Sequence, residues 1–212
     1  MRLLVAKKPL RRALRWTQLI LFAVGITLLA YCGFVLADTW SFQNGARRQL
    51  ERLRTERQEA TGAARRIASS ASQVAWVPPV PGGLIGRIEI PRLGISAIVI
   101  EGTSARSLRR AVGHIAGMAL PGQGGNVGIS GHRDTFFRPL RNIRRNDIIT
   151  LTTLLGEYRY RVVSTRIVQP DSVEELDPSR DEILTLVTCY PFYFVGPAPK
   201  RFIVRALSEP RP

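Results

Sequence analysis

The sequence has 212 residues, with 31 Lys and Arg against 16 Asp and Glu, a formal net charge of +15. This length allows one medium-sized domain with accessory segments, because domains usually hold roughly 100–150 residues. More than half of the basic excess precedes Gly82 and lies next to an apolar run, which favours membrane-surface electrostatics over a nucleic-acid footprint.

The N-terminal part has the pattern of a single membrane anchor. Residues 1–16 form a basic tail with six Lys and Arg side chains and no acid, and residues 17–37 carry no charge. As a helix with a rise of about 1.5 Å per residue, the apolar run would span about 30 Å, the hydrocarbon thickness of a bilayer. Trp16 and Trp40 flank it as interfacial aromatics do. The positive-inside rule then predicts a single-pass protein of the cell membrane, with a cytoplasmic N-terminus and everything after Asp38 outside.

The alternative to an uncleaved anchor is a signal peptide, whose apolar region is usually only about 7–15 residues long. The run at 17–37 is longer, although Val35-Leu36-Ala37 would suit a cleavage site. Cys32 lies inside the run and is interpreted as a small apolar residue of the helix. A disulfide between Cys32 and Cys189 is not expected, because it would join a membrane segment to a distant domain. Cys189 is then an unpaired extracytoplasmic thiol, for which reactivity is the usual explanation.

Residues 38–83 are predicted to connect the anchor to a folded domain at 84–212. The part at 41–75 is rich in good helix formers and poor in apolar residues, which predicts a solvated helix or a tether. It lacks the sustained apolar heptad of a coiled coil. The run VPPVPGG at 77–83 is rich in Pro and Gly, which interrupt regular secondary structure, and it marks the predicted domain boundary.

The domain at 84–212 is predicted to be all-β. Its short apolar runs are separated by turn residues, which indicates about eight strands in a barrel or sandwich. Helical signals are confined to 104–112 and 137–143, and no strand is followed by a long amphipathic helix, so a doubly wound α/β fold is not expected. The strand-like runs that stand out are 86–90, 95–100, 126–130, 147–151, 158–168, 183–188 and 201–206.

Three side chains with complementary chemistry stand at the ends of separate strand-like runs. His132 follows one run in GISGHRDTFF, Cys189 ends another in TLVTCYPF, and Arg201 opens the last in KRFIVRA. A thiol reacts as its thiolate, an imidazole can move the proton, and a guanidinium can hold an oxyanion, so the trio suits acyl transfer through a thioester. Taken singly, each residue type is more often structural: a buried thiol, a turn histidine or a solvated arginine.

These segments resemble the histidine motif, the TLxTC nucleophile motif and the arginine strand of the sortase family, in the family's order. The stretches at 86–104 and 120–132 also resemble its early strands. The resemblance implies an eight-stranded sortase-type β-barrel with short helices, in which Cys189, His132 and Arg201 are catalytic. GHRDTFF and TCYPF are most similar to class D members. An Asp-Pro-aromatic lid motif, usual in pilin-polymerising members, is absent from 41–83, which disfavours a pilus-building role.

The resemblance also implies the reaction and the partners. The Cys189 thiolate would attack the Thr carbonyl of an LPxT-like sorting signal near the C-terminus of a secreted protein. His132 would protonate the departing amine, and an amine of the cell envelope would resolve the thioester, with Arg201 orienting the signal. The expected partners are therefore sorting-signal peptides, an envelope amine and the membrane, with no nucleic acid. No cofactor is expected. The acidic segment 171–182 is a calcium candidate by analogy with some sortases, but it lacks an EF-hand pattern.

Two other functions remain open from the residues alone. A membrane-tethered cysteine hydrolase would let water resolve the thioester. A non-catalytic basic β-domain would bind envelope polymers or nucleic acid, and it predicts a buried, unreactive Cys189. Among the remaining candidates, His114 is interpreted as a packing or turn histidine and Asp134 as a turn residue in preference to a triad carboxylate. The arginines at 141–145 are interpreted as a solvated face.

Overall fold

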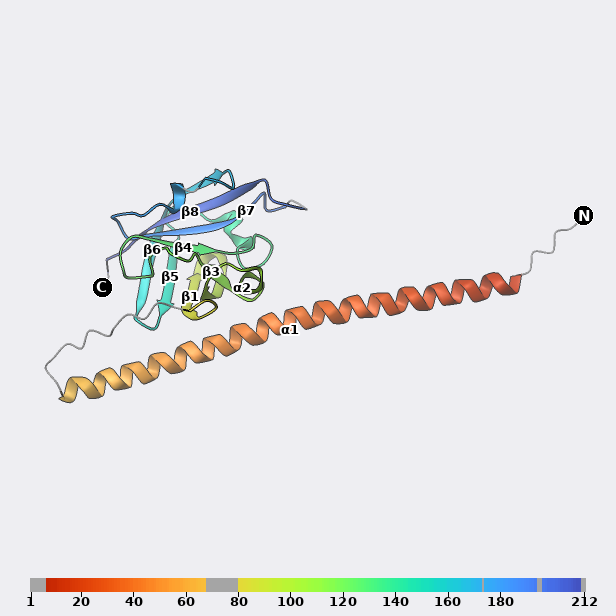
Figure 1. Ribbon diagram of the computed structural model, residues 1–212, viewed down its shortest axis with the longest axis horizontal. Coiled ribbons are helices and arrows are strands. Elements are labelled where there is room, and N and C mark those ends of the chain that lie inside the picture. Colours follow the sequence, from red (N-terminus) through yellow and green to blue (C-terminus); the bar gives the residue numbers. More distant parts are fainter. Residues whose placement is uncertain (1–6, 68–79, 173, 194–195, 211–212) are drawn as a thin grey trace, which may run out of the picture. The chain divides into compact units, whose positions relative to one another are not determined.

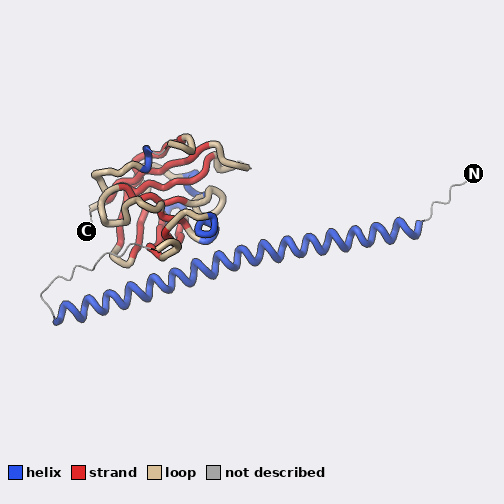
Figure 2. The backbone as a smooth tube through the Cα atoms, in the orientation of Figure 1, coloured by secondary structure: helices blue, strands red, loops and turns tan. Residues whose placement is uncertain are grey.

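The computed structural model describes residues 7–67, 80–172, 174–193 and 196–210. Within them the chain forms one long helix and a β-barrel with short helices in its loops (Figure 1, Figure 2). The chain divides into two compact units, Met1–Ser41 and Phe42–Pro212. Residues 1–6 of the predicted basic tail and residues 77–79 of the predicted Pro/Gly linker lie outside the described residues.

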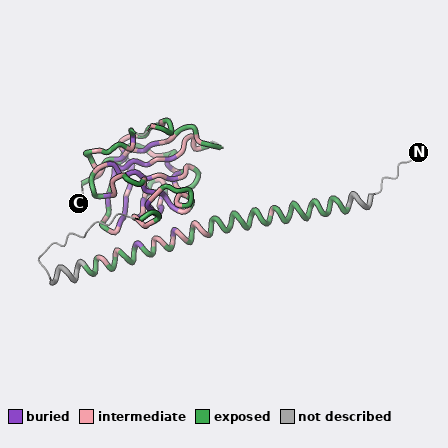
Figure 3. The backbone as a smooth tube through the Cα atoms, viewed as in Figure 1, coloured by how far each residue is buried: buried purple, intermediate pink, exposed green. Residues whose placement is uncertain are grey.

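Helix α1 (Lys7–Ile67) contains the whole apolar run predicted at 17–37. It is long and apolar enough to cross a membrane, and it is the one such helix in the part of the chain that the structure describes. The hydroxyls of Thr17, Thr27 and Thr39 each donate to the carbonyl four residues earlier, which satisfies these polar groups within the helix. The apolar side chains of the run at 17–37 are exposed (Figure 3), among them Leu19, Phe22, Leu29 and Phe34.

The second unit contains the closed barrel that the sequence predicted. Its strands follow the order β1-β2-β3-β4-β7-β8-β6-β5 around the barrel. Neighbours are antiparallel except β2 with β3 and β4 with β7, which are parallel. The strands are β1 (Leu84–Ile90), β2 (Ile95–Glu101), β3 (Val112–His114), β4 (Asn126–Ser130), β5 (Ile148–Thr153), β6 (Glu157–Val168), β7 (Ile183–Tyr190) and β8 (Lys200–Ser208). The short helices are η1 (Pro91–Leu93), α2 (Ala105–Arg110), η2 (Arg138–Asn142) and η3 (Glu174–Leu176).

Alternation of apolar and polar residues builds the core. In β6 the side chains of Tyr158, Tyr160 and Val162 are buried, whereas those of Arg159 and Arg161 between them are exposed. Successive side chains of a strand point to opposite faces, so one face of β6 lines the barrel interior. The interior is closed by buried apolar residues from every strand, including Ile88, Val99, Val112, Ile129, Leu151, Val162, Leu186 and Val204.

The part of α1 that belongs to the barrel unit covers a free edge of β2. Strand β2 pairs with β3 only from Val99 onward, so the backbone before it lacks a strand on that side. The Gln43 amide fills this gap: its Nε2 donates to the Arg110 carbonyl at 2.6 Å, and its Oε1 accepts from the Ile98 N–H at 3.0 Å. One turn later, Arg47 donates to the Ser96 carbonyl at 3.0 Å.

The docking of this helical segment on the barrel differs from the solvated helix or tether that was predicted for 41–75. The segment is helical through Ile67, but the side chains of Gln43 and Leu50 are buried, at 8% and 3% exposure. Phe42 and Ala46 pack against the apolar cluster of Ile98, Ile100 and Ala111. The difference has a physical reason, because a helix that docks through a few apolar residues and through hydrogen bonds to backbone groups leaves little trace in the hydropathy pattern.

Candidate active site

Cys189 and Arg201 face each other across two neighbouring strands. In the antiparallel pairing of β7 with β8, Cys189 is the register partner of Arg201, between the pairs Thr188–Phe202 and Tyr190–Lys200. Directly opposed residues of an antiparallel pair project from the same face of the sheet, with Cβ atoms about 4.5–5.5 Å apart. Both side chains are half-buried. Strand register alone therefore places Cys189 and Arg201 at opposed positions on one face of the sheet.

His132 reaches the same end of the barrel by way of β4. This strand runs parallel to β7, with Ser130 opposite Val187. Beyond the strand, the Gly131 N–H donates to the Val187 carbonyl at 3.1 Å, and the Thr188 hydroxyl donates to the Gly131 carbonyl at 2.7 Å. Parallel strands advance together, so this register brings His132 alongside Cys189. The buried Thr188 hydroxyl thus supports the histidine segment, on the other side of β7 from the thiol.

The turn after His132 is built on a buried aromatic ring. The Phe137 N–H donates to the His132 carbonyl at 3.1 Å, and Phe137 is fully buried. A Cβ atom at Gly131 would lie 2.7 Å from the Phe137 ring, so glycine is the residue that allows this close approach. Asp134 is exposed, and among the described residues the His132 imidazole has no hydrogen-bond partner. The imidazole is half-buried.

A salt bridge fixes the far end of the segment that carries His132. Arg92 in η1 donates through Nε and Nη2 to the two carboxylate oxygens of Asp147, and its Nη2 also donates to the Asn142 carbonyl at 2.7 Å. Asp147 accepts in addition from the Arg144 N–H at 2.7 Å. The hydrogen bond from Arg92 lowers the pKa of Asp147 below its ordinary value, against the opposing effect of burial. The corner between η2 and β5 is therefore held by an ionised carboxylate.

Arg133, in the segment that carries His132, holds the loop between β7 and β8 by hydrogen bonds that were not predicted from the sequence. Arg133, next to His132, donates through Nη1 to the Pro191 carbonyl at 2.9 Å and through Nη2 to the Gly196 carbonyl at 3.0 Å. The Arg141 guanidinium lies over the Tyr193 ring, 5.3 Å from its centroid. Arg141, Arg144 and Arg145 are exposed, as interpreted from the sequence, and Arg141 in addition contacts this aromatic ring of the loop. The available sequence signal was only the Arg that follows the histidine, one of many basic residues.

Three aromatic rings pack together where β7 ends and β8 begins. Phe192 contacts both Tyr190 and Phe202 edge-on, at centroid distances of 6.1 and 5.4 Å, and Tyr190 stacks on Phe202 at 6.5 Å. Edge-to-face and offset contacts of this kind stabilise a cluster beyond its buried area. The cluster joins the end of β7 to the start of β8, so it supports the strand ends that carry Cys189 and Arg201.

His114 lies elsewhere and has a different environment. It is the last residue of β3, is 2% exposed, and both ring nitrogens face oxygen atoms: Nδ1 lies 2.8 Å from Glu101 Oε2 and Nε2 lies 3.0 Å from the Ala119 carbonyl. With no free ring nitrogen, this histidine ties β3 to the end of β2 and to the loop that follows. This agrees with its interpretation as a packing histidine.

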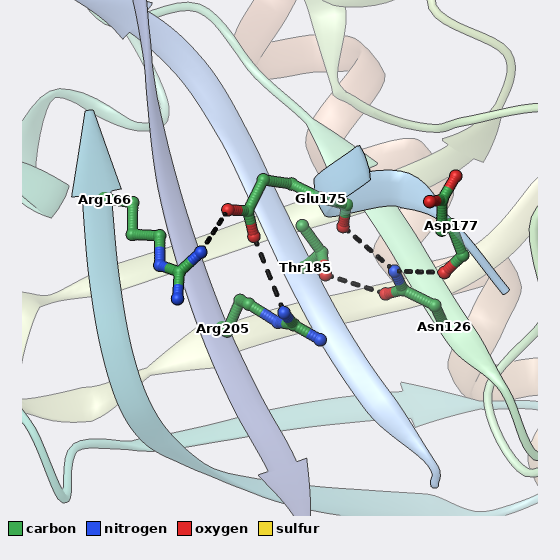
Figure 4. A network of polar contacts seen from close by, with 6 residues as sticks. All are labelled: Asn126, Arg166, Glu175, Asp177, Thr185 and Arg205. Atoms are coloured by element: carbon green, nitrogen blue, oxygen red, sulfur yellow. Dashed lines mark hydrogen bonds and ion pairs between the residues drawn. The ribbon is translucent and has the colours of Figure 1, made fainter. Parts of the chain in front are cut away.

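In the acidic segment 171–182 the Glu175 carboxylate is buried and paired inside the protein (Figure 4), whereas Asp171, Glu174, Asp177 and Asp181 are exposed. The buried Glu175 of η3 accepts from Arg166 at 2.9 Å and lies 3.6 Å from Arg205. The Asn126 amide donates to the carbonyls of Glu175 and Asp177, at 3.1 and 3.2 Å, and accepts from the Thr185 hydroxyl at 2.7 Å. These contacts attach η3 to strands β4, β6 and β8, and the Thr185 hydroxyl attaches Asn126 to β7. Among the described residues, no group of three or more His, Cys, Asp or Glu side chains could hold a metal ion.

Comparison with known proteins identifies the family. A model of the Sortase domain matches residues 88–209, more than half of the chain. The chain belongs to the sortase family. Sortase D of Bacillus subtilis strain 168 is 35% identical over 188 residues, which cover 88% of this chain and 94% of that protein. Sortases are cysteine transpeptidases, so this chain is an enzyme of that type.

Solved sortase structures share the fold. The Clostridium perfringens Sortase D5 transpeptidase aligns with a TM-score of 0.64 at 22% identity, covering 80% of this chain and 99% of that one. Sortase A from Corynebacterium diphtheriae aligns with a TM-score of 0.57 at 28% identity, covering 66% of this chain and 65% of that one. The sortase resemblance stated from the motifs is confirmed, as is the closed eight-stranded barrel that it implied.

Proposed function

We propose that the chain is a membrane-anchored transpeptidase that cuts an LPxT-like C-terminal sorting signal and transfers the acyl group to an amine of the cell envelope. Membership of the sortase family supports acyl transfer by a cysteine. The observation that carries the assignment of residues is the register of β7 and β8, in which Cys189 is opposite Arg201. His132, which follows the strand next to β7, completes the proposed trio.

The proposed reaction has two halves, each passing through a tetrahedral intermediate. In the first, the Cys189 thiolate forms a bond to the Thr carbonyl carbon, and the Arg201 guanidinium donates to the oxyanion that develops. The C–N bond then breaks, and the leaving amine takes a proton from His132. In the second half, an acceptor amine attacks the thioester and gives a proton to His132. The Cys189 thiolate leaves, and the new amide carries the sorted protein.

The anchoring part of the proposal rests on α1. Its uncharged run at 17–37 is exposed along its length, and the basic residues that precede it favour a cytoplasmic N-terminus. The barrel would then lie outside the membrane, where secreted proteins present their sorting signals. We expect no cofactor, since thiol, imidazole and guanidinium supply the nucleophile, the acid–base group and the oxyanion donors.

The test uses the full-length chain in detergent micelles. We would incubate it with LPxT-type peptides, with and without a short glycine peptide as amine, and measure adducts and products by mass spectrometry. The expected result is an acyl adduct on Cys189 and a joined peptide, also in the presence of a chelator. Cys189→Ala should abolish both, whereas Cys32→Ala, the matched control at the other cysteine, should keep them.

Each other outcome supports a different function. An adduct that only water resolves would make the chain a hydrolase. Absence of any adduct, together with a Cys189 that resists alkylation in the folded protein, would favour a non-catalytic domain that binds envelope polymers. Turnover by Cys189→Ala would contradict the proposed nucleophile.

A further inference from the structure

Arg133 connects two parts of the candidate site that are far apart in sequence. Its partners, Pro191 and Gly196, are 58 and 63 residues away, on the loop between β7 and β8. Pro191 lies where the chain leaves β7, just after Tyr190, and Gly196 lies on the way back to Lys200, the first residue of β8. One guanidinium therefore binds the outgoing and the returning limb of the loop at once. Its donors are fixed in one plane, so it also sets the spacing between the two carbonyls.

The returning limb leads directly to the arginine of the proposed trio. Arg201 donates through Nη1 to the carbonyls of Ala198 and Lys200, at 3.3 and 3.1 Å. Ala198 is two residues beyond Gly196, so Arg133 and Arg201 bind neighbouring carbonyls of the same limb. A shift of Gly196 would move the carbonyl that orients the Arg201 side chain, while the strand register would keep the backbone of Arg201 opposite Cys189.

The other end of this connection is equally well fixed. Arg133 follows His132, whose segment is held to β7 by the Thr188 hydroxyl. Arg133 thus transmits the position of the histidine segment to the loop that precedes Arg201. A second contact, from Arg141 to the ring of Tyr193, acts on the same loop from η2. A merely solvated arginine would not place two donors on carbonyls of opposite limbs.

We propose that Arg133 is a positioning residue, which holds the β7–β8 loop so that the Arg201 guanidinium stays aimed at the oxyanion formed on Cys189. The inference rests on the proposed roles of Cys189 and Arg201. It assigns Arg133 no contact with the reacting atoms. Loss of the two hydrogen bonds from Arg133 to the loop should weaken the contact of Arg201 with the oxyanion. That contact is made in the transition state, so its loss should lower kcat and leave KM nearly unchanged.

The experiment compares three variants of the full-length chain in detergent. Arg133→Gln removes the charge and the paired hydrogen bonds to Pro191 and Gly196. Arg133→Lys keeps the charge but can reach only one of the two carbonyls well. Arg138→Gln removes an exposed charge of η2 and is the matched control. We expect kcat to fall about 10- to 100-fold in Arg133→Gln, with KM within about twofold, and to fall less in Arg133→Lys. The rate of Cys189 alkylation should stay within about twofold, because the thiol keeps its surroundings.

Hydrogen exchange gives a readout that does not depend on turnover. Peptides that contain Phe192, Tyr193 and Ala198 should exchange faster in Arg133→Gln than in Arg138→Gln, while β4 and β7 stay protected. Equal kcat and equal exchange in these two variants would overturn the inference. So would a loss of kcat that only follows a drop in Tm. If the wild-type chain forms no thioester, the proposed function fails, and unchanged loop exchange would still separately refute the role of Arg133 in holding the loop.

Discussion

The two histidines of this chain lie in opposite environments, although both end short strands or follow them. His114 is buried, and each of its ring nitrogens is within 3.0 Å of an oxygen atom of the protein. His132 is half-buried, follows a glycine required by close packing, and has no side-chain partner among the described residues. The strand beside His132 carries Cys189, whereas the neighbours of His114 are a carboxylate and a backbone carbonyl.

The difference shows which property separates a structural histidine from a candidate acid–base group. A buried polar side chain stabilises a fold when its hydrogen-bonding capacity is filled, and it is then unavailable to a substrate. A general acid or base needs a ring nitrogen that can reach the reacting group. Both residues are histidines close to the end of a short strand, His114 as its last residue and His132 two residues beyond it, so the partners decide between the two roles.

Replacement of the two histidines should give opposite results, and this is the largest effect that we expect. His132→Ala should lower kcat/KM for a sorting-signal peptide by about 10²–10⁴, because proton transfer to the leaving amine is lost, and should leave Tm nearly unchanged. His114→Ala should lower the free energy of unfolding by about 3 kcal/mol, because it leaves Glu101 buried without its partner. Turnover assays and thermal unfolding of both variants test this.

Two results would break the comparison. Full activity in His132→Ala would remove that residue from the mechanism. A His114→Ala variant that is as stable as the wild type but inactive would show that His114, though enclosed, takes part in the reaction.

The parts of the molecule that could be predicted are those that depend on strand periodicity and on residues at strand ends. The pattern of short strands predicted a barrel or a sandwich and placed His132, Cys189 and Arg201 at strand ends, while the closed eight-stranded barrel was implied by the sortase resemblance. Strand β3 was missed because Val112–His114 is too short for any period to be visible, and its first residue fell within a stretch interpreted as helical. The helix there, Ala105–Arg110, ends before it.

Contacts between a side chain and a distant backbone group could not be predicted. Arg133 binds carbonyls about sixty residues away, and a carbonyl carries no mark in the sequence. Gln43 lies in a segment that is polar on most sides, yet its amide replaces the missing strand beside β2. Hydrophobic periodicity reports burial of apolar area, and these two residues act through hydrogen bonds.

Gln43 extends the comparison to a second saturated polar group. Gln43→Ala should lower the free energy of unfolding by about 1–3 kcal/mol, since the buried Ile98 N–H loses its acceptor and the Arg110 carbonyl its donor. For a unit of this size that is a Tm shift of about 2–4 °C per kcal/mol. Gln49→Ala, on the exposed side of the same helix, is the matched control and should change Tm little. Equal Tm values for the two variants would mean that the helix does not need its amide contact with β2.

Asp147 offers the smallest effect and the sharpest pH test. Its pKa is lowered mainly by the hydrogen bond from Arg92, so the stability that the carboxylate contributes is present above the ordinary Asp pKa of about 4 and is lost as the pH falls through the lower folded-state value. Asp147→Asn should therefore lower the free energy of unfolding by about 1 kcal/mol at pH 7, and by progressively less below pH 4. The effect is small because Arg92 is partly exposed and solvent weakens the ion pair. Thermal unfolding of the wild type and the variant between pH 2.5 and 7, with Asp171→Asn as an exposed control, measures the difference.

A loss of stability that does not change with pH would mean that Asp147 acts through the geometry of its hydrogen bonds and not through its charge. Activity at pH 7 should be kept in Asp147→Asn, because this carboxylate, like the His114–Glu101 pair, holds the scaffold and does not meet the substrate.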